Sequence, residues 1–140
     1  MLRGISDGAA AEVVESERLA RRWFALVEQR SFDQLKQLVH DDVVIVSKVQ
    51  AGRVVEGREA VAGFFEEALA VNLYESVTEV FAPLDESRVI VEGRLRWIDD
   101  DRVIRDDPVV WALEFRDGLL LRFVPARTAV EAEAILAQPG

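Results

Sequence analysis

The sequence of 140 residues contains no cysteine, which excludes disulfide bonds, thiolate metal ligands and cysteine nucleophiles. It has a single histidine, His40, so neither a histidine-rich zinc site nor a histidine-based catalytic triad is expected. We therefore expect no bound metal and no cofactor.

Basic side chains are scarce: 17 lysines and arginines face 26 acidic residues, for a net charge of −9. Such a surface repels phosphate backbones, so we expect no nucleic-acid partner. No apolar run is long enough to span a membrane, and the first seven residues lack the apolar stretch of a signal peptide. These absences predict a cytoplasmic protein without a membrane partner.

Half of the residues are hydrophobic, and the length predicts a single domain over residues 9–137 after a flexible N-terminus at residues 1–8. Apolar residues recur every three or four positions in the first half and every second position from about residue 72. The first pattern predicts helices near 9–30, 32–40 and 58–70, with a short strand at 43–46 and a hairpin arm at 49–56 between the last two. The second predicts strands at 73–83, 88–98, 102–116 and 119–125. Ser31–Gln34 and Thr128–Glu131 match capping boxes, and the latter begins a short terminal helix. The fold class is α+β: three N-terminal helices packed on a strongly curved, mostly antiparallel sheet.

The Arg116-Asp-Gly118 turn predicts which side chains share a face of the sheet. A three-residue loop would place Phe115 opposite Leu119 and Trp111 opposite Phe123, all on one apolar face. A two-residue loop would place Arg122 among the aromatic rings, which the cost of burying a lone charge disfavours. The opposite face then carries the charged residues Glu92, Arg94, Arg96, Glu114 and Arg122, with the apolar Leu120 and Val124 among them, as a solvated surface or a dimer interface.

Several segments, in their order and spacing, resemble the SnoaL-like branch of the NTF2-like superfamily over about residues 10–137. They are Arg22–Glu28, Leu38–Val44, Gly57–Val61, Val110–Gly118 and Ala126–Leu136. The resemblance implies a conical α+β barrel, usually a homodimer, whose helices cover a concave sheet and leave a hydrophobic pocket. It leaves the activity open, because the same fold hosts polyketide cyclases, ketosteroid isomerases, limonene-epoxide hydrolases, scytalone dehydratases and non-catalytic adaptors.

The catalytic residues of two of these enzymes are not found at the matching positions. Trp23 stands where ketosteroid isomerases have an oxyanion-binding tyrosine, Ser47 where they have the general base and Trp111 where they have a second acid. Trp23 and Ser47 retain only hydrogen-bonding capacity. Arg94 and Arg96 have outward parity, with no inward acid on that strand, so the Asp-Arg-Asp set of the epoxide hydrolases is not found either. Catalytic residues are therefore unassigned.

Seven residues are candidates for lining a ligand pocket: Trp23, Ser47, Val91, Trp97, Trp111, Phe115 and Phe123. Three tryptophans on one face fit a hydrophobic ligand site and a plain core equally well. We expect a protein that binds a small, largely apolar molecule, with an isomerisation, cyclisation or dehydration if it is an enzyme. The alternative is a non-catalytic protein-interaction module with a solid core.

The conspicuous polar residues have structural interpretations. His40 stands at the expected end of the second helix, where it would interact with the helix dipole. Asp41 and Asp42 diverge along an extended chain, which disfavours paired carboxylate catalysis. The acidic runs at 99–101 and 106–107 are typical of turns, with a weak divalent-ion site as the alternative.

Overall fold

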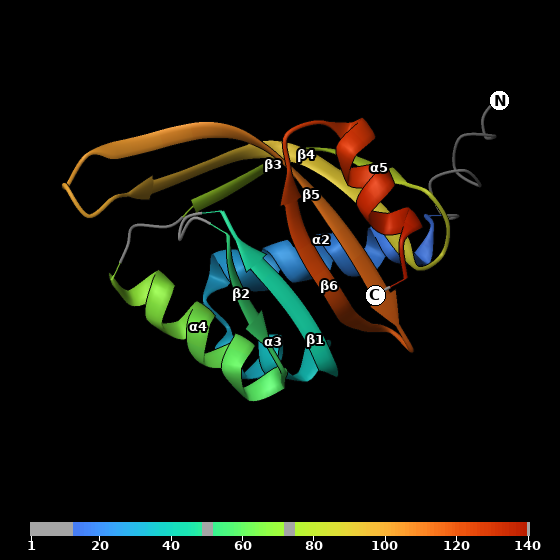
Figure 1. Cartoon of the computed structure of the whole chain (residues 1–140). Helices are drawn as coiled ribbons and strands as arrows, with labels where there is room; N and C mark the ends of the chain where they lie inside the picture. The colour runs from blue at the N-terminus through green and yellow to red at the C-terminus, as the bar shows by residue number, and fades with distance from the viewer. Residues whose placement is uncertain (1–12, 49–51, 72–74, 140) are drawn as a thin grey trace, which may run out of the picture.

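The computed structural model describes residues 13–48, 52–71 and 75–139 (Figure 1). The expectations for residues 1–8, for the start of the first helix and for the Ala51 side of the first hairpin turn lie outside these residues. The elements, in chain order, are α2 (Glu15–Gln29), α3 (Phe32–Leu38), β1 (Val39–Ser47), β2 (Arg53–Glu56), α4 (Arg58–Val71), β3 (Glu75–Pro83), β4 (Arg88–Ile98), β5 (Ile104–Arg116), β6 (Leu119–Ala126) and α5 (Ala129–Ala137). No helix among the described residues is long and apolar enough to cross a membrane.

The strands form one mixed sheet in the order β2-β1-β6-β5-β4-β3, and the sheet is not closed. All neighbouring strands are antiparallel except β1 and β6, which run parallel. The segregated α+β class and the mostly antiparallel sheet are therefore confirmed, and β4 begins and ends at the predicted residues.

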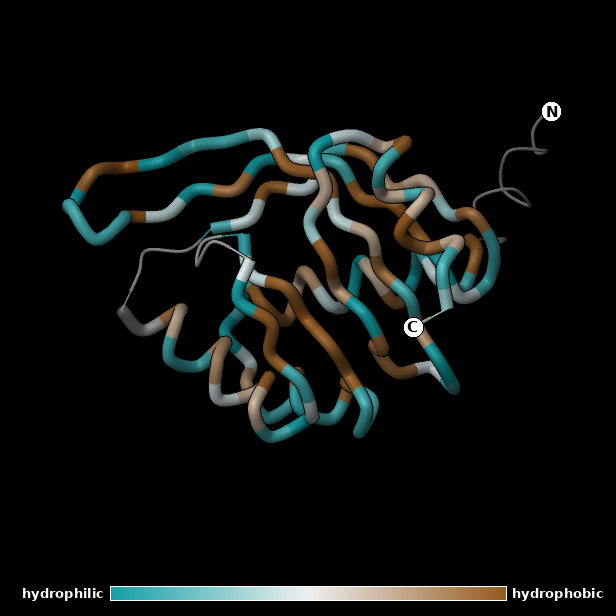
Figure 2. The backbone as a smooth tube through the Cα atoms, in the orientation of Figure 1, coloured by the Kyte–Doolittle hydropathy of each residue, from teal (hydrophilic) through white to brown (hydrophobic). Residues whose placement is uncertain are grey.

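Each face of the sheet buries its own hydrophobic cluster. The larger cluster joins α2, α3 and α4 to the inner face, with Trp23, Phe65, Trp111 and Phe123 among its members. The smaller cluster lies between α5 and the outer face. Figure 2 shows the same division, with hydrophobic segments where the helices meet the strands and mixed character along the projecting β4–β5 hairpin.

The second helix ends two residues earlier than predicted, at Leu38, and His40 lies in β1. The reason is Val39, which is fully buried and pairs in parallel with Leu120 of β6. A β-branched residue that gains a strand partner and a core position there favours extended backbone over another helical turn. The assignment of His40 to a helix end is thus wrong.

The β5–β6 turn has two residues, not the three predicted, because Arg116 pairs with Leu119. Asp117 and Gly118 have φ of 55° and 78°, as a type I′ turn requires, and Asp-Gly is a preferred pair there. A register shift follows at once, since Phe115 pairs with Leu120 while Glu114 pairs with Arg122. The bulge at Leu121 restores the parity, so Arg122 still faces away from the aromatic rings.

Two consequences of this bulge correct the predicted faces. Leu120 points into the larger cluster and not outward. Phe123 lies opposite Leu113, whereas Trp111 lies opposite Pro125.

The terminal helix α5 lies on the outer face across β4, β5 and β6 (Figure 1). Ala132 and Leu136 of α5 pack on Ile90, Val110 and Ala112. The helix begins as predicted, with the Thr128 hydroxyl accepting a hydrogen bond from the Glu131 amide at 3.1 Å. The Ser31 side chain, by contrast, makes no capping bond to α3.

Candidate functional site

A recess opens beside Ser47, at the end of β1 where it faces α4. We call it the Ser47 recess. It is lined by Ile45, Val46, Ser47, Lys48, Phe64, Phe65, Leu95, Trp111, Phe123 and Pro125. Its open volume is about 10 Å³, which is room for a single water molecule.

Aromatic rings form the inner wall of the Ser47 recess. Trp111 stacks on Phe123 with ring centroids 6.3 Å apart, and Phe64 meets Phe65 edge to face at 5.4 Å. Trp23 lies behind this wall, 5.3 Å from Phe65 and 5.8 Å from Phe123. The rings of Phe65 and Phe123 therefore contact both the recess and Trp23.

The indole N–H of Trp23 is an unsatisfied donor in the interior. Trp23 is 1% exposed, and its Nε1 finds no acceptor among the residues that the structure describes. A second recess, which Trp23 lines with Val39, Val61 and Phe65, is filled by side chains. Leaving a buried donor without a partner costs about 1–3 kcal/mol, and an acceptor that reached this N–H would recover that cost.

Ser47 is the other buried polar residue near the aromatic wall, at 7% exposed. Its position is fixed by the β1–β2 ladder, where it pairs with Arg53, and by a hydrogen bond from the Gly52 amide to its carbonyl oxygen at 2.8 Å. The hydroxyl lies at the recess, where it can donate or accept one further hydrogen bond.

The structure brings four of the seven sequence candidates together. Ser47, Trp111 and Phe123 line the recess, and Trp23 touches its inner wall. Val91, Trp97 and Phe115 belong to the same hydrophobic cluster but do not line the recess. Trp97 lies two residues beyond Leu95 on β4, where it pairs with Arg105.

The sequence interpretation missed the other lining residues, which are Ile45, Val46, Lys48, Phe64, Phe65, Leu95 and Pro125. Periodicity predicts that Phe64 and Phe65 lie on the buried side of their helix, but it cannot say which part of a core a helix faces. Strand parity would place Lys48 on the face opposite to Ser47, so the sequence pattern gave no signal for it.

His40 is remote from the recess, because it is the second residue of β1 and Ser47 is the last. Seven residues of strand span roughly 23 Å. Its Nδ1 accepts a hydrogen bond from the Asp42 amide at 3.0 Å, while Asp41 pairs with Arg58 at 3.1 Å. These contacts give both groups structural roles.

The acidic runs also serve local structure. Asp99 accepts hydrogen bonds from the amides of Asp101 and Val103 and from Arg105, which closes the β4–β5 turn. Asp106 pairs with Arg94 and Arg96 on the outer face. No group of three or more acidic or histidine side chains in the described ranges is placed to hold a metal ion.

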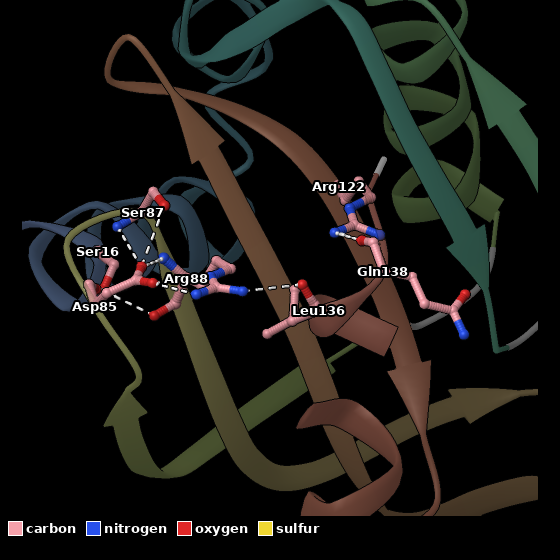
Figure 3. Close-up of polar contacts among 7 residues, drawn as sticks. All are labelled: Ser16, Asp85, Ser87, Arg88, Arg122, Leu136 and Gln138. Carbon is pink, nitrogen blue, oxygen red and sulfur yellow. Dashed lines mark hydrogen bonds and ion pairs between the residues drawn. The ribbon is translucent and has the colours of Figure 1, made fainter. Parts of the chain in front are cut away.

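A polar cluster at the far end of the sheet ties three elements together (Figure 3). Asp85 accepts hydrogen bonds from the Ser87 and Arg88 amides and from the Arg88 side chain. Arg88 also donates to the Leu136 carbonyl of α5 at 3.1 Å, and Ser16 of α2 donates to the Asp85 carbonyl at 2.6 Å. The hydrogen bonds from Arg88, above all, lower the pKa of Asp85 to about 2.

Arg122 holds the end of α5 in a similar way. It pairs with Glu114 at 2.6 Å and donates to the carbonyls of Ile135 and Gln138. The last carbonyls of a helix lack partners within it, so these contacts, together with the one from Arg88, fix α5 on the sheet. The outer charged face thus serves α5 rather than solvent alone.

A family model and several solved structures are similar to this chain. The sequence matches the family model "SnoaL-like domain" over residues 20–123. No curated protein matches the chain.

Solved structures similar to this one include three with a similar span. RV0760c from Mycobacterium tuberculosis, in complex with estradiol-17β-hemisuccinate, has a TM-score of 0.72 at 19% identity, covering 85% of this chain and 98% of its own. The Δ5-3-ketosteroid isomerase from a Mycobacterium species has a TM-score of 0.69 at 16% identity, with 85% and 97% covered. A protein described as a SnoaL-like polyketide cyclase from Shewanella putrefaciens has a TM-score of 0.68 at 18% identity, with 90% and 98% covered. At these identities the likeness shows the fold.

Proposed function

Because this chain belongs to the SnoaL-like domain family, we propose that it binds a small, largely apolar molecule at the Ser47 recess. The observation that carries the proposal is the unsatisfied N–H of Trp23 behind an aromatic wall. An apolar ligand with one acceptor oxygen would satisfy that donor and bury its own surface among the rings. A similar fold that binds a steroid ester, RV0760c, supports the same class of ligand.

Binding requires the rings to move, because ligand pockets have volumes of about 300–1,000 Å³. Phe65 and Phe123 separate the recess from Trp23, so rotation of these two side chains would join both spaces. The proposal therefore predicts that the ligand displaces ring contacts and does not enter a ready cavity.

The residues at the recess support binding better than acid–base chemistry. Its described lining includes no carboxylate and no imidazole, and Ser47 and Lys48 are its polar side chains. Any isomerisation, cyclisation or dehydration would then depend on hydrogen bonding and on holding the substrate in a reactive shape.

A second candidate function, a non-catalytic interaction module, is favoured by the filled space beside Trp23. The two candidates differ in their response to small molecules. We would titrate the folded protein with steroid-like, terpenoid and polyketide-like compounds and record tryptophan fluorescence. Saturable quenching by any of them supports the ligand-binding function, whereas a complete absence of quenching supports the interaction module.

We also propose a homodimer, on different surface residues from those the sequence suggested. Leu120 is buried, but Val77, Val80 and Ile104 are exposed on the outer face of the β3–β5 part of the sheet. Exposed apolar residues on one sheet face are typical of an interface between protein chains. A cytoplasmic location and the lack of a nucleic-acid partner remain predictions from composition.

A further inference from the structure

Lys48 lies at the Ser47 recess, directly after the last residue of β1. It is one of two lysines in the sequence, and its side chain is half-buried. Phe64, Trp111 and Pro125 line the same recess from three other elements. The ammonium group is therefore attached to the rim of an apolar surface.

No counter-ion holds Lys48 in the part of the chain that the structure describes. The other lysine, Lys36, pairs with Glu59 at 2.7 Å, but no ion pair or side-chain hydrogen bond joins Lys48 to a described residue. None of the described lining residues is acidic, although the chain carries 26 acidic residues. An ammonium without a local carboxylate gives this rim a positive potential on a negative protein.

A second cation lies beside the same rim. Arg53 pairs with Ser47 across the β1–β2 ladder, and its guanidinium lies 5.4 Å from the ring centroid of Phe64, a lining residue. Lys48 and Arg53 thus come from the two sides of one hairpin. Whatever else its guanidinium contacts, the charge of Arg53 adds to the positive potential of this rim, which favours an anionic group at Lys48.

The inner end of the site has a different polarity. The Trp23 N–H there is a neutral donor inside an aromatic cluster, where an anion would lose its hydration without a charge partner. A neutral oxygen suits that end and an anion suits the rim, so the two ends of the site select opposite ends of one molecule.

We propose that the ligand is an elongated apolar molecule with one anionic end, which Lys48 binds at the rim of the Ser47 recess, where the charge of Arg53 adds to the positive potential. This inference rests on the proposed ligand-binding function and adds the chemical class of the ligand.

A matched pair of fluorescent probes tests it: 1-anilinonaphthalene-8-sulfonate and N-phenyl-1-naphthylamine, which share the apolar rings but differ in the sulfonate. We expect both to bind the wild-type protein at one shared site, the sulfonate more tightly. Lys48→Met should reduce the ratio of the two affinities by about tenfold or more, the usual size of a hydrogen bond to a charged group. Lys48→Arg should retain most of the ratio, and higher salt should lower it.

Lys36→Met is the control, because it removes the other lysine from a position outside the recess and should leave the ratio unchanged. Circular dichroism and thermal unfolding must show that each variant is folded. If Lys48→Met is not folded, Lys48→Gln takes its place. If both probes bind and Lys48 variants leave the ratio unchanged, the inference is overturned while the proposed function stands. If neither probe binds the folded wild type, the proposed function fails with it.

Discussion

Gly93 allows β3 and β4 to approach each other closely. It lies in β4 beside Thr78 of β3, just where the register of these two strands shifts. A Cβ atom at this position would overlap the backbone carbonyl of Val77, so the close approach of the strands requires a residue without a side chain.

We expect Gly93→Ala to lower the free energy of unfolding by about 2 kcal/mol or more, because backbone must move to admit the methyl group. Urea unfolding followed by circular dichroism measures this. Gly63→Ala in α4 is the control, since open space surrounds that position and alanine favours helix by up to about 1 kcal/mol. Equal effects of the two substitutions would show that the contact at Val77 is unimportant.

A comparison of Trp111 with Trp97 distinguishes a role in the recess from a role in the core, because Trp111 lines the recess and Trp97 does not. We expect Trp111→Phe to weaken the binding of an apolar probe several-fold, through loss of contact area with the ligand. Trp97→Phe should change the affinity little. Titration of N-phenyl-1-naphthylamine into each folded variant measures both affinities. A larger loss from Trp97→Phe would move the site toward the β4–β5 hairpin.

The helices α3 and α5 depend on different contacts for their first turns. Thr128 caps α5 through its hydroxyl, whereas Ser31 precedes α3 without a side-chain bond. In α3 the first turn is closed by the Leu35 amide donating to the Ser31 carbonyl at 2.9 Å, which any residue could provide. The same four-residue motif therefore has different energetic weight at the two positions.

Thr128→Ala should lower the free energy of unfolding by about 1 kcal/mol, the usual value of an N-cap side chain. Ser31→Ala should cost clearly less. Chemical denaturation of both variants under the same conditions gives the comparison. A cost at Ser31 equal to that at Thr128 would mean that its hydroxyl caps α3 in solution.

Asp85 gives the junction of α2, β4 and α5 a dependence on pH. Its pKa is lowered from 3.8 to about 2, mainly by the hydrogen bonds from Arg88, so its carboxylate stabilises the folded state above about pH 4. That stabilisation is lost as the pH falls from about 4 to about 2. In this range the carboxyl group is protonated more readily in the unfolded chain than in the folded protein, which favours unfolding. Asp85 is partly exposed, which reduces the size of the effect.

We therefore expect Asp85→Asn to be less stable than wild type near neutral pH, with the difference shrinking below about pH 4. Urea midpoints measured from about pH 6 to about pH 2.5 follow that difference. Glu133→Gln, which changes an exposed carboxylate of α5 outside this cluster, serves as the control. A difference that is constant over the whole range would contradict the lowered pKa.

Periodicity located most elements, since helices and strands that bury one regular face, such as α4 and β4, follow the sequence pattern closely. The rest depended on contacts distant in sequence. Val39 is extended because β6 lies beside it. The Asp-Gly pair favours a two-residue turn, which would turn Arg122 toward the aromatic rings, and the bulge at Leu121 prevents this. The site was predicted in part for the same reason: strand parity places Trp111 and Phe123 inward, but it cannot show which rings fill the space between them.

For the molecule as a whole, the outer face of the sheet is divided between α5 and the exposed apolar residues of the β3–β5 part. The smaller cluster under α5 is already buried, whereas the apolar residues of the second part are exposed. We therefore place the proposed homodimer interface on the side of the sheet that ends at β3.

We expect static light scattering at tens of micromolar to give the mass of a dimer, since a specific interface of ordinary affinity remains associated there. Ile104→Asp should convert it to a monomer by placing a charge among the apolar residues of the interface. Val54→Asp is the control, because Val54 is exposed on β2 at the opposite edge of the sheet. A wild-type monomer at this concentration would contradict the dimer.

The parallel pairing of β1 with β6 has a consequence for folding. Val39 and Ile45 pair with Leu120 and Phe123, so the joint in the middle of the sheet links residues more than half the chain apart. The helices α2, α3 and α4 leave the ribosome before the strands that cover them, and the apolar side of β1 stays open until β6 has been made. Contacts at such separation close slowly, because the chain loses much entropy before they form. We therefore expect the closure of this joint to be a slow step in folding, and the interval before it closes to be one in which the nascent chain exposes apolar surface.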